Sequence, residues 1–177
     1  MILIVHGAWD SRQDRTCGVS VLADKIRAQN LSKNVREIDV NEPITFGPIE
    51  LTEEPNVWLG FSNGGDVVLS AYLDLLSRTE DTTVTSLQAH FVFLDFVYRG
   101  ARQVFDRWPI QLPSSVQSCL CFLRTRLAGP VPPYHSYIAK ADGDKFRNIS
   151  VDADHPGVPA SLDVQNQVCA RIAEIFA

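Results

Sequence analysis

Residues 56–66 read Asn-Val-Trp-Leu-Gly-Phe-Ser-Asn-Gly-Gly-Asp, and they join a strand pattern directly to a helix pattern. The run Asn56–Gly60 is mostly apolar, as is typical of a strand buried on both faces. After a turn, Gly64–Ser77 is nearly all apolar, which predicts a helix buried on most of its sides. Buried strands that alternate with helices are typical of a parallel sheet covered by helices, so an α/β fold is favoured.

The same alternation continues on either side of this stretch. We expect a single α/β domain over residues 1–177, with a mostly parallel sheet of about six strands between two layers of helices. Strands are expected at Met1–Val5, Val35–Val40, Asn56–Gly60, Ala89–Val97, Ser118–Leu123 and Phe146–Val151, and further helices at Val19–Ala28 and Leu162–Phe176. Residues Thr125–Lys145 contain no clear element, and loops of such length are often functional.

The composition is that of an ordinary globular domain. The chain has 177 residues, of which 45% are hydrophobic and 21% charged, and its net charge is −5. The charges are mixed and form no basic run, so we do not expect nucleic acid as a partner. No apolar stretch approaches the ~20 residues that a membrane-spanning helix needs. The N-terminal Met1–Val5 has neither a basic region nor a cleavage motif, which predicts a cytoplasmic protein.

The sequence offers no metal-ligand spacing. The four cysteines form no CxxC pair and are expected to be reduced; they are Cys17, Cys119, Cys121 and Cys169. Among the carboxylates that could suggest a metal, Asp10, Asp14 and Asp66, the last is explained by its place in the first turn of a helix. We expect no metal and no other cofactor, because the chemistry described next needs neither.

The motif that carries chemistry is Gly60-Phe61-Ser62-Asn63-Gly64, a G-x-S-x-G between a strand and a helix. In that context the serine lies on a sharp, strained turn that presents its hydroxyl as a nucleophile. The helix N-terminus behind it provides free N–H groups for a developing oxyanion. The alternatives are a plain glycine-rich turn or a phosphate-binding loop, although the spacing matches neither common phosphate motif.

Together with Val5-His6-Gly7-Ala8-Trp9 after the first strand and a late His155, this motif resembles the α/β-hydrolase superfamily. The chain is most similar to its small serine esterases and lipases, which have no lid. The resemblance implies oxyanion-hole N–H groups at Ala8 or Trp9 and at Asn63, and it makes His6 structural rather than catalytic. The elements leave no room for a helical lid after the fourth strand.

A catalytic base must follow the serine in chain order, as it does in this superfamily. Of the three histidines after Ser62, His90 opens an apolar strand at the end away from the expected site, so a structural role is favoured. His135 lies in the long loop and stays an alternative. His155 follows the last strand, where open α/β sheets place their ligands, and is the expected base.

The acid is less clear, because no carboxylate follows the fifth strand closely. We expect Asp95, which ends an apolar strand, because a carboxylate buried there would cost several kcal/mol without a partner such as a histidine N–H. Asp142 or Asp144 is the alternative acid. Asp95 could instead cap the strand end or pair with Arg99 or Arg102.

These residues predict a serine hydrolase that acts on an ester or thioester through a Ser62–His155–Asp95 triad and an acyl-enzyme intermediate. Its partner would be a small or acylated substrate, which aromatic side chains at Trp9, Tyr98 and Tyr134 are placed to contact. Two alternatives remain: a binding protein on the same scaffold with a silent serine, and an acyltransferase that uses the same triad.

Overall fold

A six-stranded parallel sheet forms the centre of the protein, seen here in a computed structural model that describes residues 1–8, 10–44, 55–78, 88–96, 112–126 and 146–177. The strands lie in the order β2-β1-β3-β4-β5-β6 and are all parallel. Their bounds are β1 Ile2–Val5, β2 Val35–Ile38, β3 Asn56–Phe61, β4 Ala89–Leu94, β5 Val116–Arg124 and β6 Phe146–Val151. The α/β fold that the sequence predicts is confirmed, with β2 at one edge.

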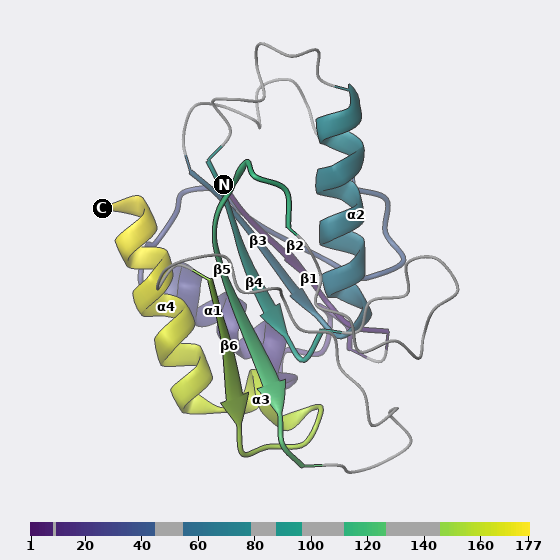
Figure 1. Cartoon of the computed structure of the whole chain (residues 1–177). Helices are drawn as coiled ribbons and strands as arrows, with labels where there is room; N and C mark the ends of the chain where they lie inside the picture. The colour runs from purple at the N-terminus through teal and green to yellow at the C-terminus, as the bar shows by residue number, and fades with distance from the viewer. Residues whose placement is uncertain (9, 45–54, 79–87, 97–111, 127–145) are drawn as a thin grey trace.

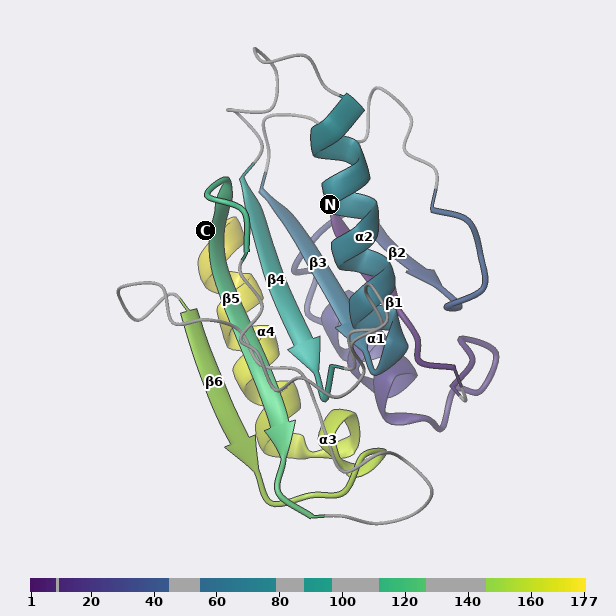
Figure 2. The same ribbon diagram turned by 45° about the vertical axis from the view of Figure 1, so that its right-hand side comes forward.

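Helices cover both faces of the sheet (Figures 1 and 2). The helices are α1 Gly18–Ala28, α2 Asn63–Arg78, α3 Gly157–Ala160 and α4 Leu162–Phe176. One face packs with α1, α3 and α4 in a core that includes Ile2, Leu59 and Phe122. The other face packs with α2 in a second core, around Trp58 and Phe91. Burial on both faces explains why β1, β3 and β4 are almost entirely apolar.

Two features of the helices differ in part from the prediction. The helix α2 is fully buried along a stripe that includes Val68, Leu69 and Tyr72, and four further apolar residues pack half-buried against the same core, Val67, Ala71, Leu75 and Leu76. Its burial is therefore wider than one stripe, but one face stays exposed, where Leu73 is 42% exposed. The short helix α3 is missing from the sequence-based prediction, because four residues are too few to show a helical period.

The strand order reverses at β1, which pairs with β2 on one side and β3 on the other. Side chains that follow the carboxyl ends of β1, β3 and β4 therefore meet at one edge of the sheet. Open α/β sheets bind their ligands at such a switch point. No helix in the described part of the chain is long and apolar enough to cross a membrane.

Candidate active site

Ser62 lies at the turn between β3 and α2 with a backbone φ of 53°. This left-handed conformation is uncommon for a residue that carries a Cβ, and at functional sites it costs of order 1–3 kcal/mol. The residue is 5% exposed, and its N–H donates to the Leu94 carbonyl at 3.0 Å. The surrounding sheet and helix thus hold Ser62 in the strained turn that the G-x-S-x-G spacing predicts.

The two glycines of this motif let α2 start directly on the sheet. A Cβ on Gly60 would lie 2.5 Å from the Gly65 Cα, and one on Gly64 would lie 2.4 Å from the Val5 carbonyl oxygen. Both distances are far inside van der Waals contact. The absent side chains therefore bring the helix N-terminus, with its unpaired N–H groups, next to Ser62.

Asp95 follows β4, also in a left-handed conformation (φ 44°), and its carboxylate is fully buried. Its Oδ1 accepts a hydrogen bond from the Arg124 backbone N–H at 3.4 Å. Its Oδ2 pairs with the Arg124 guanidinium at 2.9 Å and with Nδ1 of His155. The buried charge is thus matched by a buried cation, as burial of a carboxylate requires.

His155 lies in the turn between β6 and α3 and is 4% exposed. The ion-paired Asp95 carboxylate can only accept a hydrogen bond, so Nδ1 of His155 donates to it. The other ring nitrogen, Nε2, then carries the lone pair and can accept a proton. The imidazole stacks on Phe61, with ring centroids 4.7 Å apart. Two contacts, one polar and one aromatic, therefore fix the ring beside the residue that precedes Ser62.

The structure thus brings Asp95 and His155 into direct contact and places Ser62 at the neighbouring strand end. Within the described residues, no hydrogen bond joins the Ser62 hydroxyl to His155. Catalytic hydrogen bonds are often long in the absence of substrate and shorten when it binds.

Two of the residues predicted to line an oxyanion hole are described. Asn63 is the first residue of α2, so its N–H has no partner within the helix. Ala8 follows Gly7, and a Cβ built on Gly7 would lie 3.1 Å from that of Ser62. The chain after β1 therefore passes close to the serine.

Several predicted residues lie outside the described residues. They are Trp9, Tyr98 and Tyr134 of the substrate pocket, the alternative base His135, the alternative acids Asp142 and Asp144, and the arginines Arg99 and Arg102. The segment in which a lid would fall is also outside them. These predictions stay predictions.

Arg124 is the residue that sequence reasoning missed. It ends β5 and is 4% exposed, an unusual burial for an arginine. An arginine that directly follows an apolar strand, one strand along from a buried aspartate, was the available signal. Because β4 and β5 pair in parallel, their two ends meet.

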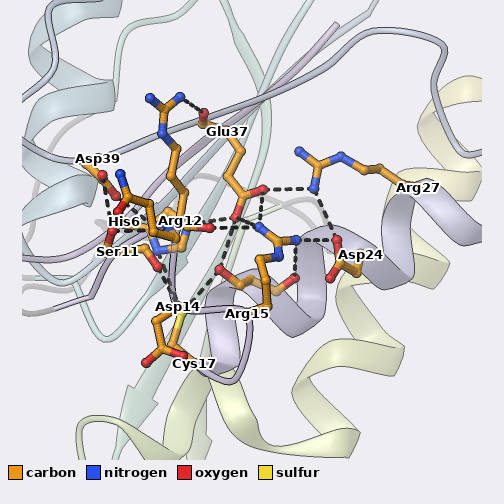
Figure 3. Close-up of polar contacts among 12 residues, drawn as sticks. His6, Ser11, Arg12, Asp14, Arg15, Cys17, Asp24, Arg27, Glu37 and Asp39 are labelled. Atoms are coloured by element: carbon orange, nitrogen blue, oxygen red, sulfur yellow. Dashed lines mark hydrogen bonds and ion pairs between the residues drawn. The ribbon is translucent and has the colours of Figure 1, made fainter.

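Residues of β2, of α1 and of the turn between β1 and α1 form a second polar cluster, shown in Figure 3. Buried Glu37 of β2 lies at its centre and accepts a hydrogen bond from Nε2 of His6 at 2.8 Å. Arg15 and Arg27 pair with the same carboxylate at 3.0 and 2.8 Å. Burial raises the pKa of Glu37, but the bonds from His6, Arg27 and Arg15 outweigh it and lower that pKa to about 2.

Asp10 connects this cluster with the serine site electrostatically. Burial raises the pKa of its carboxyl, while attraction to His6 and to His155 acts in the opposite direction. His6 itself is fully buried and bonded to Glu37.

Comparison with known proteins identifies no matching family model, no similar curated protein and no similar solved structure.

Proposed function

We propose that this protein is a serine hydrolase of the α/β-hydrolase type, which cleaves carboxylic esters or thioesters. The observation that carries the proposal is a serine in a left-handed turn at a helix N-terminus, next to a buried aspartate–histidine pair at the same sheet edge. That combination of a strained serine, an oriented imidazole and free N–H groups is the set that acyl transfer needs.

Nε2 of His155 would take the Ser62 proton as the hydroxyl attacks the carbonyl. Asp95 keeps the imidazole in the required tautomer and stabilises the imidazolium that forms. Backbone N–H groups at Asn63 and after Gly7 would hold the tetrahedral oxyanion, where loss of one donor typically lowers kcat by about 10²–10³. Water then attacks the acyl-enzyme, with His155 again as the base.

Labelling with a fluorophosphonate tests this proposal, because such a probe bonds covalently only to an activated serine. We expect the wild type and Ser70→Ala to label, and Ser62→Ala to lose all labelling. Ser70 is the matched control, since it lies exposed on the same helix. Mass spectrometry of the labelled peptide identifies the modified residue.

The Asp95→Asn variant should label and turn over p-nitrophenyl esters about 10⁴-fold more slowly, because Asn stabilises the wrong imidazole tautomer. Asp152→Asn changes an exposed residue just after β6 that pairs with Arg126, and it should leave both rates unchanged. If the folded wild type does not label, the serine is silent and the protein is a binding protein on this scaffold. If it labels but does not hydrolyse esters, acyl transfer to another acceptor becomes the better proposal.

A further inference from the structure

Three side chains with metal-binding atoms meet beyond the end of β1. They are His6, Asp10 and Cys17, and one ligand atom from each lies within 4.8 Å of the other two. His6 is buried, whereas Asp10 and Cys17 are half-buried. We propose that these three residues bind a divalent transition-metal ion of the zinc type. The proposal concerns metal binding alone and does not depend on hydrolase activity.

The orientation of His6 supports this assignment. Its Nε2 donates to the Glu37 carboxylate at 2.8 Å, which leaves the Nδ1 lone pair directed at the Cys17 sulfur. Arg15 and Arg27 hold Glu37 in place from its other side. A carboxylate that binds the second ring nitrogen is the usual outer partner of a metal-bound histidine, because it fixes the tautomer and makes the ligand more basic.

The distance between two of the ligand atoms fits a tetrahedral centre. With Zn–S of about 2.3 Å and Zn–N of about 2.0–2.1 Å, a tetrahedral angle separates sulfur and nitrogen by about 3.6 Å. The Cys17 Sγ and His6 Nδ1 atoms are 3.8 Å apart. The two groups therefore need almost no rearrangement to share an ion, and the Asp10 carboxylate, within 4.8 Å of both, supplies the third ligand.

The donor set selects the class of metal. One nitrogen, one sulfur and one oxygen suit Zn²⁺ or Co²⁺, whereas Mg²⁺ and Ca²⁺ prefer oxygen alone. Binding replaces the S–H bond of Cys17 by a metal–sulfur bond and releases that proton to solvent. Three protein ligands leave the fourth position for water, since two of them are half-buried rather than enclosed.

The spacing of His6, Asp10 and Cys17 along the chain matches no recognised metal-binding motif. The fold brings them together because β1 ends at Val5 and the chain then turns back to start α1 at Gly18. Cys17 is the N-cap residue of that helix. The expectation of a metal-free protein rested on the absence of metal-ligand spacing and on a chemistry that needs no metal, and neither observation tells where such a turn places its side chains.

Titration of chelator-treated protein with Co²⁺ tests the proposal. We expect one equivalent to give the visible d–d bands of tetrahedral cobalt and a near-ultraviolet thiolate-to-cobalt band. Zn²⁺ should remove both. Cys17→Ser should abolish the thiolate band and Asp10→Asn should weaken cobalt binding by more than about 10–100-fold, the usual cost of losing only an outer partner.

Two matched controls keep the result specific. Cys169→Ser removes a buried thiol elsewhere, and Asp14→Asn alters an acid of the same turn that is not among the three ligands. Both should bind cobalt as the wild type does, with the fold of each variant checked by circular dichroism. A wild-type spectrum that does not change with cobalt, or a thiolate band that persists in Cys17→Ser, overturns the proposal. Fluorophosphonate labelling of the same samples reports on the serine separately.

Discussion

At the scale of single residues, Asp95 is held by several contacts at once. Its two carboxylate oxygens face the Arg124 backbone, the Arg124 guanidinium and the His155 ring. An aspartate that only orients a histidine needs that histidine and hydrogen bonds that stabilise its charge. Here the Arg124 guanidinium of β5 also pairs with the Asp95 carboxylate. The strength of the Asp95–His155 interaction therefore depends on Arg124 as well.

We therefore predict that Arg124→Met destabilises the protein by about 3–5 kcal/mol, because it leaves the Asp95 charge buried without its cation. Urea unfolding followed by circular dichroism measures this loss. The double variant Arg124→Met/Asp95→Asn should recover part of it, since the uncompensated charge is gone. Arg126→Met, which breaks an exposed pair with Asp152, should barely change the unfolding midpoint. Strictly additive effects of Arg124→Met and Asp95→Asn would show that the two side chains do not interact.

At the scale of elements, Glu37 ties the edge strand β2 to its neighbours. The carboxylate holds His6 at the end of β1 and reaches Arg27 of α1 and Arg15 of the turn before it. An edge strand of four residues has few ladder bonds of its own. The contacts of Glu37 therefore help to hold β2 in its register against β1.

This network predicts how stability changes with acid. The pKa of Glu37 is lowered from 4.5 to about 2 in the folded protein, so its contribution is fully present above pH 4.5. It is lost as the pH falls from there through about 2. The Glu37→Gln variant should be less stable than the wild type at pH 6 and approach it near pH 2. Chemical unfolding at several pH values, with a chelator present, measures the difference; a constant difference at every pH would contradict the prediction.

The sequence predicted elements better than contacts, and the reason is physical. The bounds of β6 and α4 match the structure residue for residue, because each is set by a local pattern of apolar residues. The pair Asp95 and Arg124 depends on which strands become neighbours. No local sequence pattern determines the order of the strands in the sheet. The sequence therefore predicted that Asp95 has a partner, but it could not predict that Arg124 is one of its partners.

At the scale of the whole molecule, the two cores determine which thiols reagents can reach. All four cysteines are free; Cys119, Cys121 and Cys169 are buried, and Cys17 is half-buried. Burial raises the pKa of Cys119 well above its ordinary value and raises that of Cys169 as well. Thiolate is the reactive form, so burial and a raised pKa both protect Cys119 and Cys169, and burial protects Cys121.

We predict that a brief treatment of the native protein with iodoacetamide modifies Cys17 alone. The three buried thiols should react only after unfolding in urea. Peptide mass spectrometry counts the modified residues in each state, and added Zn²⁺ should protect Cys17 if the metal proposal holds. Rapid modification of Cys119 in the native state would mean that the core around β5 opens easily.

The position of β1 between β2 and β3 also has a consequence for synthesis on the ribosome. About 50 residues separate the end of β1 from the start of β3, which at ~5–20 residues per second takes about 3–10 s to translate. During that time the most apolar strand of the sheet has at best one neighbour. The nascent chain therefore exposes apolar surface of β1 early, and His155 can reach Asp95 only after a further 60 residues have emerged.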